Sequence, residues 1–414
     1  MSSESAHGRQ VNFGPGPAAL PTSVLEEASK GILNFQGTGI GISEISHRSK
    51  EFVAYLENLK SLIREQLDVP ESHAIMFTQG GGSAQFSAVA MNMLSRYRLL
   101  HPNAKAEDIK MDYVVTGRWS EKAAEEARRL GGGSVNVVVD SRKYSATGKL
   151  FDNIPPHEKS VYNFSPDPAL ICYCENETVD GVEFSHEPTS PAAFPFDLLP
   201  DAKLLPLVAD YSSSFMCRTI PRLADHAIIF AGAQKNVGPA GLTILIVRKD
   251  CIVDVDAAVK FGASPVPLTL SYKTLFDTNS LYNTPPVFSM YVTGLVLEHL
   301  KALGGMPYFE ELNRKKFTAV YEVVKKGAQQ GTFQLKVKEG SESWMNVVFD
   351  IPDEAAKKRF LDDAKKNGLL NLAGHRLVGG IRVSLYNAIT LEQTLQLVDY
   401  CNKFLEDELK SKAQ

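Results

Sequence analysis

From about residue 50 to residue 250, the chain alternates segments of helical periodicity with short apolar runs rich in β-branched residues. The segments 51–67 and 83–97 place apolar residues three and four positions apart, which predicts amphipathic helices that pack one face on a sheet. A further helix is predicted over 121–130, with Ser120 as its N-cap. This alternation is typical of an α/β fold in which helices cover a largely parallel sheet.

The apolar runs between these helices are mostly continuous, as expected for strands that are buried on both faces. Together with a strand-like run before the glycines at 80–82, they predict a mostly parallel, seven-stranded type of sheet. The other predicted strands are 112–116, 135–139, 169–174, 204–210, 227–232 and 242–247.

After about residue 300 the pattern changes to long helical stretches separated by two short apolar runs, at 344–351 and 380–386. This arrangement is typical of a smaller α+β domain. We therefore predict a large α/β domain over 21–300 and a small domain formed by 1–20 and 301–414.

The composition fits a soluble globular protein, because 44% of the 414 residues are hydrophobic and 22% are charged. The net charge of -4 includes no long basic run, so no nucleic-acid or membrane partner is expected. Five cysteines without a CxxC pair indicate neither a disulfide framework nor a zinc site, and no metal is expected. The first ten residues lack the apolar core of a signal peptide, so we expect a cytoplasmic protein.

Candidate chemistry lies where polar residues follow buried strands, because ligands of open α/β sheets bind beyond the carboxyl ends of the strands. The first such place is the run Gly80-Gly81-Gly82-Ser83, which precedes a predicted helix. Backbone N–H groups at a helix N-terminus bind phosphate well, although the same glycines could form a simple tight turn. No Gly-Lys-Ser/Thr follows them, so the run is not a nucleotide P-loop.

Two charged residues follow predicted strands farther along the chain. Asp210 ends one strand, and its carboxylate needs a cationic or N–H partner unless it caps a turn. Lys235 is the one charge in the stretch IIFAGAQKNVGPAGLTILIV, and a lysine in a crevice can become a nucleophile because desolvation lowers its pKa. A lysine that only extends from a strand end into solvent is the alternative.

A phosphate-binding loop, an aspartate and a lysine at strand ends are the groups that pyridoxal 5'-phosphate requires. The lysine forms a Schiff base with its aldehyde, the aspartate keeps its ring nitrogen protonated and the loop holds its phosphate. Trp119, one of two tryptophans, follows another predicted strand and could stack on the ring, or it could be a core residue.

A series of motifs in the same order resembles the phosphoserine aminotransferase family, which consists of class V, fold-type I pyridoxal-phosphate enzymes. The resemblance runs nearly end to end. The motifs are NFGPGPAALP, ISHRS, GGGSAQF, TGRWSEKA, NETVDG, ADYSSS, AGAQKNVGPAGL, LYNTPP and GHRLVGGIRVSLYNA.

The resemblance implies a role for each matching residue around pyridoxal 5'-phosphate. Lys235 would form the imine, Asp210 would pair with the ring nitrogen, and Trp119 would stack on the ring. Thr178 would bond the side of the phenolic oxygen. The phosphate would be held by Gly82, Ser83 and Gln234, and by Asn283 and Thr284 of a neighbouring subunit, which implies a homodimer with shared active sites.

The resemblance further implies a cluster that binds the substrate anion, formed by His47, Arg48, His375, Arg376 and Arg382. Arginine suits this task because its planar guanidinium donates to carboxylate and phosphate groups in a bidentate manner. Taken singly, each His-Arg pair could equally form an ordinary surface ion pair.

The expected reaction transfers the amino group of glutamate to 3-phosphohydroxypyruvate, giving O-phospho-L-serine and 2-oxoglutarate in serine biosynthesis. An alanine–glyoxylate or serine–pyruvate aminotransferase of class V is the first alternative. A cysteine desulfurase is disfavoured because none of the five cysteines lies in an evident glycine-rich or basic loop. A nucleotide-binding module without covalent chemistry is a remote alternative, because neither GxGxxG nor GxxxxGK[ST] is present.

Overall fold

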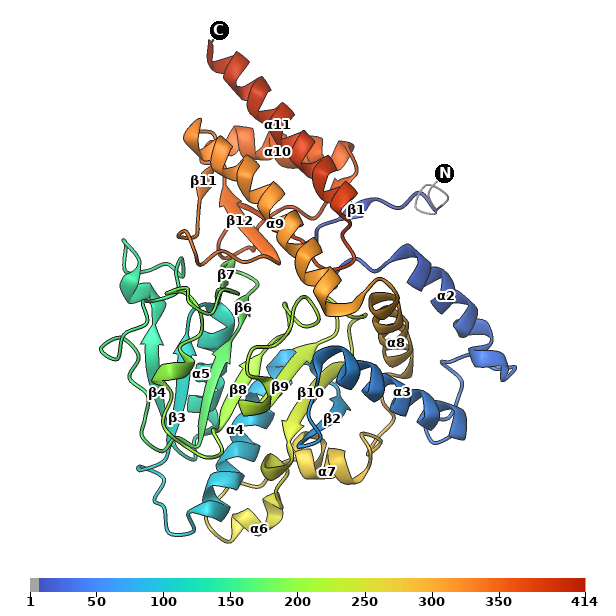
Figure 1. Ribbon diagram of the computed structural model, residues 1–414, viewed down its shortest axis with the longest axis vertical. Helices are drawn as coiled ribbons and strands as arrows, with labels where there is room; N and C mark the ends of the chain where they lie inside the picture. The colour runs from blue at the N-terminus through green and yellow to red at the C-terminus, as the bar shows by residue number, and fades with distance from the viewer. Residues whose placement is uncertain (1–6, 414) are drawn as a thin grey trace.

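The computed structural model describes residues 7–413, and a seven-stranded sheet lies at its centre (Figure 1). Six of the strands run in the same direction, and β10, which lies between β2 and β9, runs antiparallel to both. The predicted α/β fold with a mostly parallel sheet is confirmed. In spatial order the strands are β2 (His73–Thr78), β10 (Thr243–Arg248), β9 (His226–Gly232), β8 (Leu207–Asp210), β5 (Leu170–Cys174), β3 (Lys110–Val115) and β4 (Ser134–Asp140).

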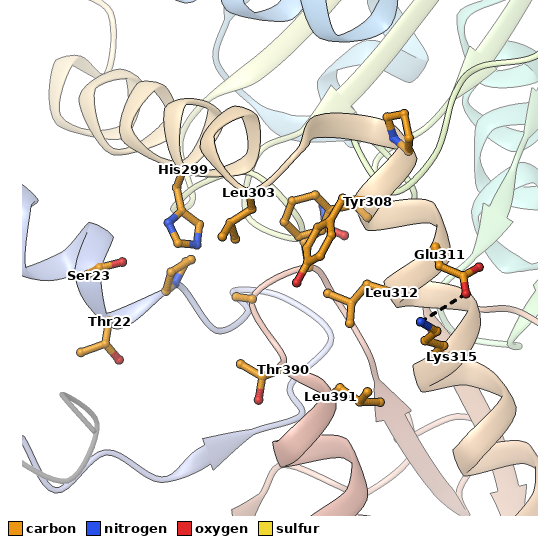
Figure 2. Close-up of a pocket in the computed structure, with 15 residues that line it drawn as sticks. Thr22, Ser23, His299, Leu303, Tyr308, Glu311, Leu312, Lys315, Thr390 and Leu391 are labelled. Atoms are coloured by element: carbon orange, nitrogen blue, oxygen red, sulfur yellow. Dashed lines mark ion pairs between the residues drawn. The ribbon is translucent and has the colours of Figure 1, made fainter. Parts of the chain in front are cut away.

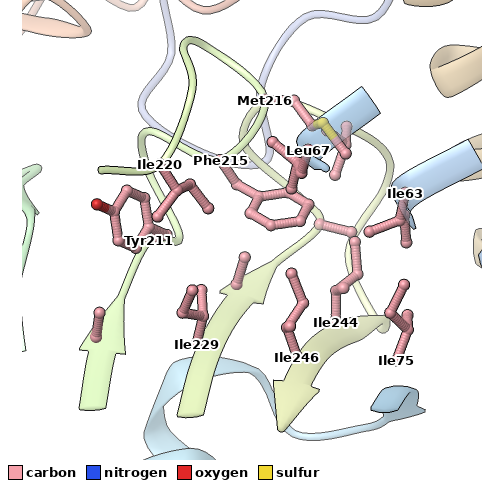
Figure 3. Close-up of a cluster of buried hydrophobic side chains, with 14 of the residues drawn as sticks. Ile63, Leu67, Ile75, Tyr211, Phe215, Met216, Ile220, Ile229, Ile244 and Ile246 are labelled. Atoms are coloured by element: carbon pink, nitrogen blue, oxygen red, sulfur yellow. The ribbon is translucent and has the colours of Figure 1, made fainter. Parts of the chain in front are cut away.

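Helices cover both faces of this sheet, which explains why most of its strands are buried throughout. One face is covered by α3 (Lys50–Leu67) and α8 (Val287–Ala302), and α2 (Thr22–Leu33) packs on the outer side of α8. The other face packs against α4 (Gly81–Leu100) and α5 (Arg118–Leu130). Figure 3 shows the first interface, where Ile63 of α3 faces Ile75, Ile244 and Ile246 of the sheet.

Helix α5 begins earlier than its sequence predicted. Gly117 occupies the N-cap position, so the prediction that Ser120 is the N-cap is wrong. The Ser120 hydroxyl instead accepts hydrogen bonds from the backbone N–H groups of Thr116 and Gly117. The first N–H groups of the helix are bonded by a carboxylate from a distant loop, and the local sequence could not reveal that partner.

The C-terminal part contains a second, three-stranded sheet in the order β11-β12-β14, packed against long helices (Figure 1). The N-terminal strand β1 (Val11–Asn12) pairs in parallel with β13 (Leu369–Leu370), so residues near both ends of the chain lie together. The division into domains at residues 20 and 300 stays a prediction. The remaining elements here are β11 (Gln334–Leu335), β12 (Asn346–Asp350), β14 (Ile381–Ser384), α9 (Gly305–Gln329), α10 (Glu354–Lys366) and α11 (Leu391–Ala413).

Smaller elements connect the sheets. The hairpin of β6 (Asn176–Glu177) and β7 (Val182–Glu183) follows β5, and the proline-rich segment after it is irregular apart from one short turn of helix at Phe196–Leu198. Two short helices, α6 (Val255–Val259) and α7 (Tyr272–Asp277), lie between β10 and α8. Among the described residues, no helix combines the length and the apolar character needed to cross a membrane.

Candidate active site

Seven of the predicted site residues meet around one cavity of about 190 Å³ beyond the carboxyl ends of β5, β8 and β9. These seven are Gly82, Ser83, Trp119, Thr178, Asp210, Gln234 and Lys235. Gly80, Gly81, Phe86, Cys174, Asn176, Ser212 and Ser213 complete the wall.

This cavity is not the largest one. A cavity of about 830 Å³ lies between the start of α2, the α8–α9 connection and the start of α11, lined by residues such as Thr22, His299 and Tyr308 (Figure 2). None of the predicted site residues lines it. The small cavity is the candidate active site because reactive groups converge there, whereas volume alone identifies no chemistry.

Lys235 lies on the turn between β9 and β10, and its side chain reaches into the small cavity. Its Nζ atom donates a hydrogen bond to Oγ1 of Thr178 at 2.6 Å and lies 5.8 Å from the centre of the Trp119 ring. Burial lowers the pKa of Lys235, while the nearby Asp210 carboxylate acts in the opposite direction. Desolvation therefore favours the neutral amine, which is the nucleophilic form.

The N-terminal segment lies against the lysine. The backbone N–H of Ala18 donates to the carbonyl oxygen of Gln234 at 2.9 Å. An added Cβ on Gly16, whose φ is +130°, would lie 3.3 Å from Cγ of Lys235. A glycine at this position therefore allows the backbone to approach the lysine closely.

Asp210 ends β8 and is buried beside the same cavity. Burial raises the pKa of its carboxyl group, and the charge of Lys235 together with hydrogen bonds from Ser212 acts against that rise. The backbone N–H of Ser212 donates to Oδ1 of Asp210 at 2.9 Å, and the hydroxyl of Ser212 accepts from the N–H of Gly232 at 3.1 Å. Ser212 thus joins the ends of β8 and β9, which carry Asp210 and lead to Lys235.

The glycine run forms the N-terminus of α4, as its sequence predicted. Gly80 is the N-cap with φ of +96°, and the N–H of Ala84 is the first to bond a helix carbonyl, that of Gly80. The N–H groups of Gly82 and Ser83 therefore have no partner within the helix, and the positive helix end favours an anion. An added Cβ on Gly82 would lie 3.7 Å from Oδ2 of Asp210, so a side chain there would extend into the space between the loop and the carboxylate.

Trp119 lies in the first turn of α5 with its ring at the cavity. Lys122 places Nζ over the ring, 4.7 Å from its centre, and Phe86 packs against it at 6.5 Å. Among residues 7–413, the buried indole Nε1 finds no hydrogen-bond partner. Because a buried indole N–H usually finds a partner, this free donor is consistent with a polar ligand at the ring.

A group of basic side chains lies beside the cavity. Arg382 of β14 is buried, and its Nη1 donates to the carbonyl oxygen of Thr178 at 3.3 Å. Its Nε has no partner in the part of the chain that the structure describes. The pKa of His375 is lowered by burial and then by the charges of Arg382, Arg376, Lys122 and Arg118. The structure thus brings His375, Arg376 and Arg382 together, and their role in binding the substrate anion stays a prediction. An anion is the ligand that such a cluster favours.

Seven predicted residues do not line the cavity of this chain. Three of them, His375, Arg376 and Arg382, form the basic group described above, and the other four are His47, Arg48, Asn283 and Thr284. His47 and Arg48 precede α3, where Nε2 of His47 is buried without a partner. Asn283 and Thr284 are exposed in the segment before α8. The carbonyl oxygen of Thr284 accepts from Nε2 of Gln79 at 2.9 Å, so this segment borders the outer side of the glycine run.

The sequence had not singled out Ser212, Asn176, Arg118 or Lys122 as site residues. Asn176 donates to Oγ of Ser213 at 2.9 Å and to Oδ1 of Asn346 at 3.0 Å, which links the cavity wall to β12. Ser212 and Asn176 could have been found, since each lies just beyond the end of a buried strand, β8 and β5 respectively. Arg118 and Lys122 flank Trp119 on a helix, where charged residues are too common to give a signal.

The family model of class-V aminotransferases matches residues 10–397 of the chain. A probable phosphoserine aminotransferase of Caenorhabditis elegans is 40% identical over 404 residues, which cover 97% of this chain and 98% of the relative. The phosphoserine aminotransferase of Acinetobacter baylyi is 39% identical over 398 residues, covering 96% of this chain and 99% of that protein. The pyridoxal-phosphate-bound phosphoserine aminotransferase of Trichomonas vaginalis is 32% identical, with a TM-score of 0.80 over 95% of this chain and all of that one.

Proposed function

The chain belongs to the class-V aminotransferase family, and we propose that it is a phosphoserine aminotransferase. It uses pyridoxal 5'-phosphate to transfer the amino group of glutamate to 3-phosphohydroxypyruvate, which yields O-phospho-L-serine and 2-oxoglutarate. The observation that carries this proposal is the position of Lys235, whose Nζ lies in one cavity with Asp210 and the N-terminus of α4.

The residues around the cavity fit pyridoxal 5'-phosphate. The free N–H groups of Gly82 and Ser83 suit its phosphate, the buried Asp210 suits a protonated ring nitrogen, and Trp119 lines the same cavity and suits stacking on the ring. When bound, the cofactor supplies an aldehyde that condenses with amines and a ring that withdraws electrons from the substrate Cα. Thr178 would bond the phenolic side of the ring, and Gln234 would help to hold the phosphate.

Lys235 has two tasks in this proposal. Its amine holds the cofactor between turnovers, and during a turnover its Nζ moves a proton to and from the substrate Cα. Both tasks require the unprotonated amine, which burial favours. Thr178 orients Nζ through the 2.6 Å hydrogen bond, and the buried Asp210 carboxylate stabilises the positive charge of the ring nitrogen.

The basic cluster gives the reaction its preference for anionic substrates. Arg382 would take a substrate carboxylate, because its buried guanidinium retains an unpaired Nε and is fixed by its bond to the Thr178 carbonyl. His375 and Arg376 lie beside it and would take the second anionic group, which is a phosphate in phosphoserine and a carboxylate in glutamate. Alanine and serine have no second anionic group, so this cluster disfavours the alanine–glyoxylate and serine–pyruvate alternatives.

We further propose that the active protein is a homodimer in which each cavity is completed by a second copy of the chain. The support is that His47, Arg48, Asn283 and Thr284 neither line the cavity of their own chain nor belong to the basic group around His375. Mixing two inactive variants tests this proposal. If Lys235→Ala and Arg48→Ala chains form mixed dimers, one intact site per mixed dimer should restore roughly a quarter of the wild-type activity. No recovery after verified subunit exchange would contradict shared sites.

A comparison of amino donors tests the substrate assignment. Phosphoserine, alanine and serine are each offered with 2-oxoglutarate, and glutamate formation is measured. We expect kcat/KM to be at least about a hundredfold higher for phosphoserine, as the loss of a paired anionic contact costs about 3 kcal/mol. Equal values for the three donors would overturn the assignment.

We also propose a cytoplasmic location, which is supported by five buried cysteines that are all unpaired.

A further inference from the structure

The carboxylate of Glu177 bonds the start of helix α5, which carries Trp119. Oε2 of Glu177 accepts from the backbone N–H of Trp119 at 2.8 Å. Oε1 accepts from both the backbone N–H and the hydroxyl of Ser120, at 2.9 Å and 2.6 Å. Glu177 is fully buried, and burial followed by the charge of Asp180 raises the pKa of its carboxyl group to about 7, while the hydrogen bonds from Ser120 and Trp119 act against that rise.

The chain leaves room for this carboxylate at Gly117. An added Cβ on Gly117 would lie 2.3 Å from Cδ of Glu177, closer than side-chain atoms approach one another. The φ of Gly117 is −170°, which is extended backbone open to any residue. The close contact with Glu177 therefore explains why position 117 is a glycine, since its backbone conformation does not require one.

A second carboxylate from the same turn completes the attachment. Oδ2 of Asp180 accepts from the backbone N–H of Arg118 at 3.0 Å, so the first three N–H groups of α5 are all bonded by the 177–180 turn. Thr178, in the same turn, accepts from Nζ of Lys235 and offers its carbonyl to Arg382. One turn thus contacts the tryptophan's helix, the lysine and the arginine.

We propose that Glu177 is a positioning residue that fixes the Trp119 ring relative to Lys235 and Thr178, and so sets the plane in which the cofactor ring is held. This inference rests on the proposed binding of pyridoxal phosphate. Glu177 touches no reacting atom itself. It acts through the backbone of Trp119 on one side and through its neighbour Thr178 on the other, which are otherwise 59 positions apart along the chain.

The Glu177→Gln substitution tests the inference because it keeps the shape of the side chain. Its amide group would place an N–H donor against the N–H of Trp119 or Ser120, where only an acceptor fits. The measurement uses a Trp344→Phe background, in which Trp119 is the one remaining tryptophan. Near-ultraviolet circular dichroism of the cofactor-free protein reports the immobilisation of Trp119. Titration with pyridoxal phosphate then reports stacking in two ways: the quenching of Trp119 fluorescence and the visible circular dichroism of the bound cofactor.

We expect Glu177→Gln to weaken the near-ultraviolet signal of Trp119 and to reduce the quenching at saturating cofactor by about twofold, with kcat about ten- to a hundredfold lower. Asp353→Asn is the matched control. Asp353 is also a carboxylate at a helix N-terminus, where it accepts from the N–H of Ala356 at 2.7 Å in α10, and it should leave all three optical signals unchanged. Optical signals identical to those of the parent would overturn the inference.

Gly117→Ala provides a second variant in case Glu177→Gln does not fold. It keeps the carboxylate but displaces it, so it should change the same optical signals in the same direction. Unchanged signals in this variant would also overturn the inference. Failure of the proposed function would look different: the Trp344→Phe parent itself would then show neither quenching nor a visible signal with pyridoxal phosphate.

Discussion

The Nζ atom of Lys235 donates a hydrogen bond to Oγ1 of Thr178 over 2.6 Å. The two residues come from different strand ends, since Thr178 follows β6 and Lys235 follows β9. This bond fixes the amine within the cavity and gives Thr178 a role in placing the nucleophile, in addition to any contact with the cofactor.

Replacing Thr178 by valine should therefore lower activity without unfolding the protein. Valine keeps the branched shape but removes the hydroxyl, and a lost hydrogen bond of this kind costs about 1.5 kcal/mol, or roughly tenfold in kcat. Steady-state kinetics with phosphoserine measure the change. Thr178→Ser restores the hydroxyl and should recover most of the rate; a serine variant as slow as the valine variant would contradict the role of this bond.

Arg382→Lys should raise KM for phosphoserine. Lysine keeps the positive charge but cannot reproduce the planar guanidinium that bonds the Thr178 carbonyl and presents a free Nε. The loss of a charge-assisted bond of about 1.5–3 kcal/mol corresponds to about ten- to a hundredfold in kcat/KM. Cofactor absorbance should remain at the wild-type level. An unchanged KM would show that Arg382 does not bind the substrate anion.

Lys316 should be essential for stability although it lies outside the cavity. It is fully buried in α9 and donates to the carbonyl oxygens of Leu385, Tyr386 and Ile389 at 2.8, 3.0 and 3.0 Å. Lys316→Met leaves all three carbonyls without their donor and should lower the free energy of unfolding by about 3–5 kcal/mol.

Denaturant unfolding measures this loss. The neighbouring Lys315 is the control, because it is exposed and pairs only with Glu311 at the surface. Lys315→Met should change the free energy of unfolding by no more than about 0.5 kcal/mol. Equal effects of the two substitutions would show that the buried contacts of Lys316 contribute little.

His226 should make the protein sensitive to acid. Burial lowers its pKa from 6.5 to about 4 in the folded state. Between these two pH values the unfolded chain binds a proton at this residue and the folded chain does not, so the free energy of unfolding falls as the pH falls. The pKa difference corresponds to about 3 kcal/mol.

Urea unfolding of wild type and His226→Gln at a series of pH values isolates this contribution. Well above pH 6.5 the imidazole is neutral in both states, so the stability difference between the two proteins should not change with pH there. Below pH 6.5 the wild type should lose more stability than the variant as the pH falls. A difference that stays constant down to pH 4 would contradict the shifted pKa.

Much of the fold could be predicted from the sequence because its strands are buried on both faces. Continuous apolar runs such as 227–232 and 242–247 identify such strands directly, and the structure places β9 and β10 there. The start of α5 was predicted wrongly for a physical reason. Its N–H groups are bonded by Glu177, 57 positions from Ser120, and no local pattern contains that information.

In the candidate site, too, local patterns predict some residues, whereas others depend on contacts between distant segments. Lys235, Asp210 and Gly82 were predicted because each lies at the end of a buried strand or a few residues beyond it, where ligands of such sheets bind. Glu177 was missed because its role depends on a contact between separate segments. His47 and Asn283 were proposed from resemblance alone, and their place beside a cavity stays a prediction, since a second chain is required to test it.

The central claim is that Lys235 binds the cofactor covalently, and the most direct test is to locate the bond. The purified protein is reduced with borohydride, digested and analysed by mass spectrometry. We predict a pyridoxyl-phosphate group on the peptide that contains Lys235, together with loss of the modified peptide and of activity in Lys235→Ala. A modification on another lysine, or a fully active Lys235→Ala variant, would contradict the account.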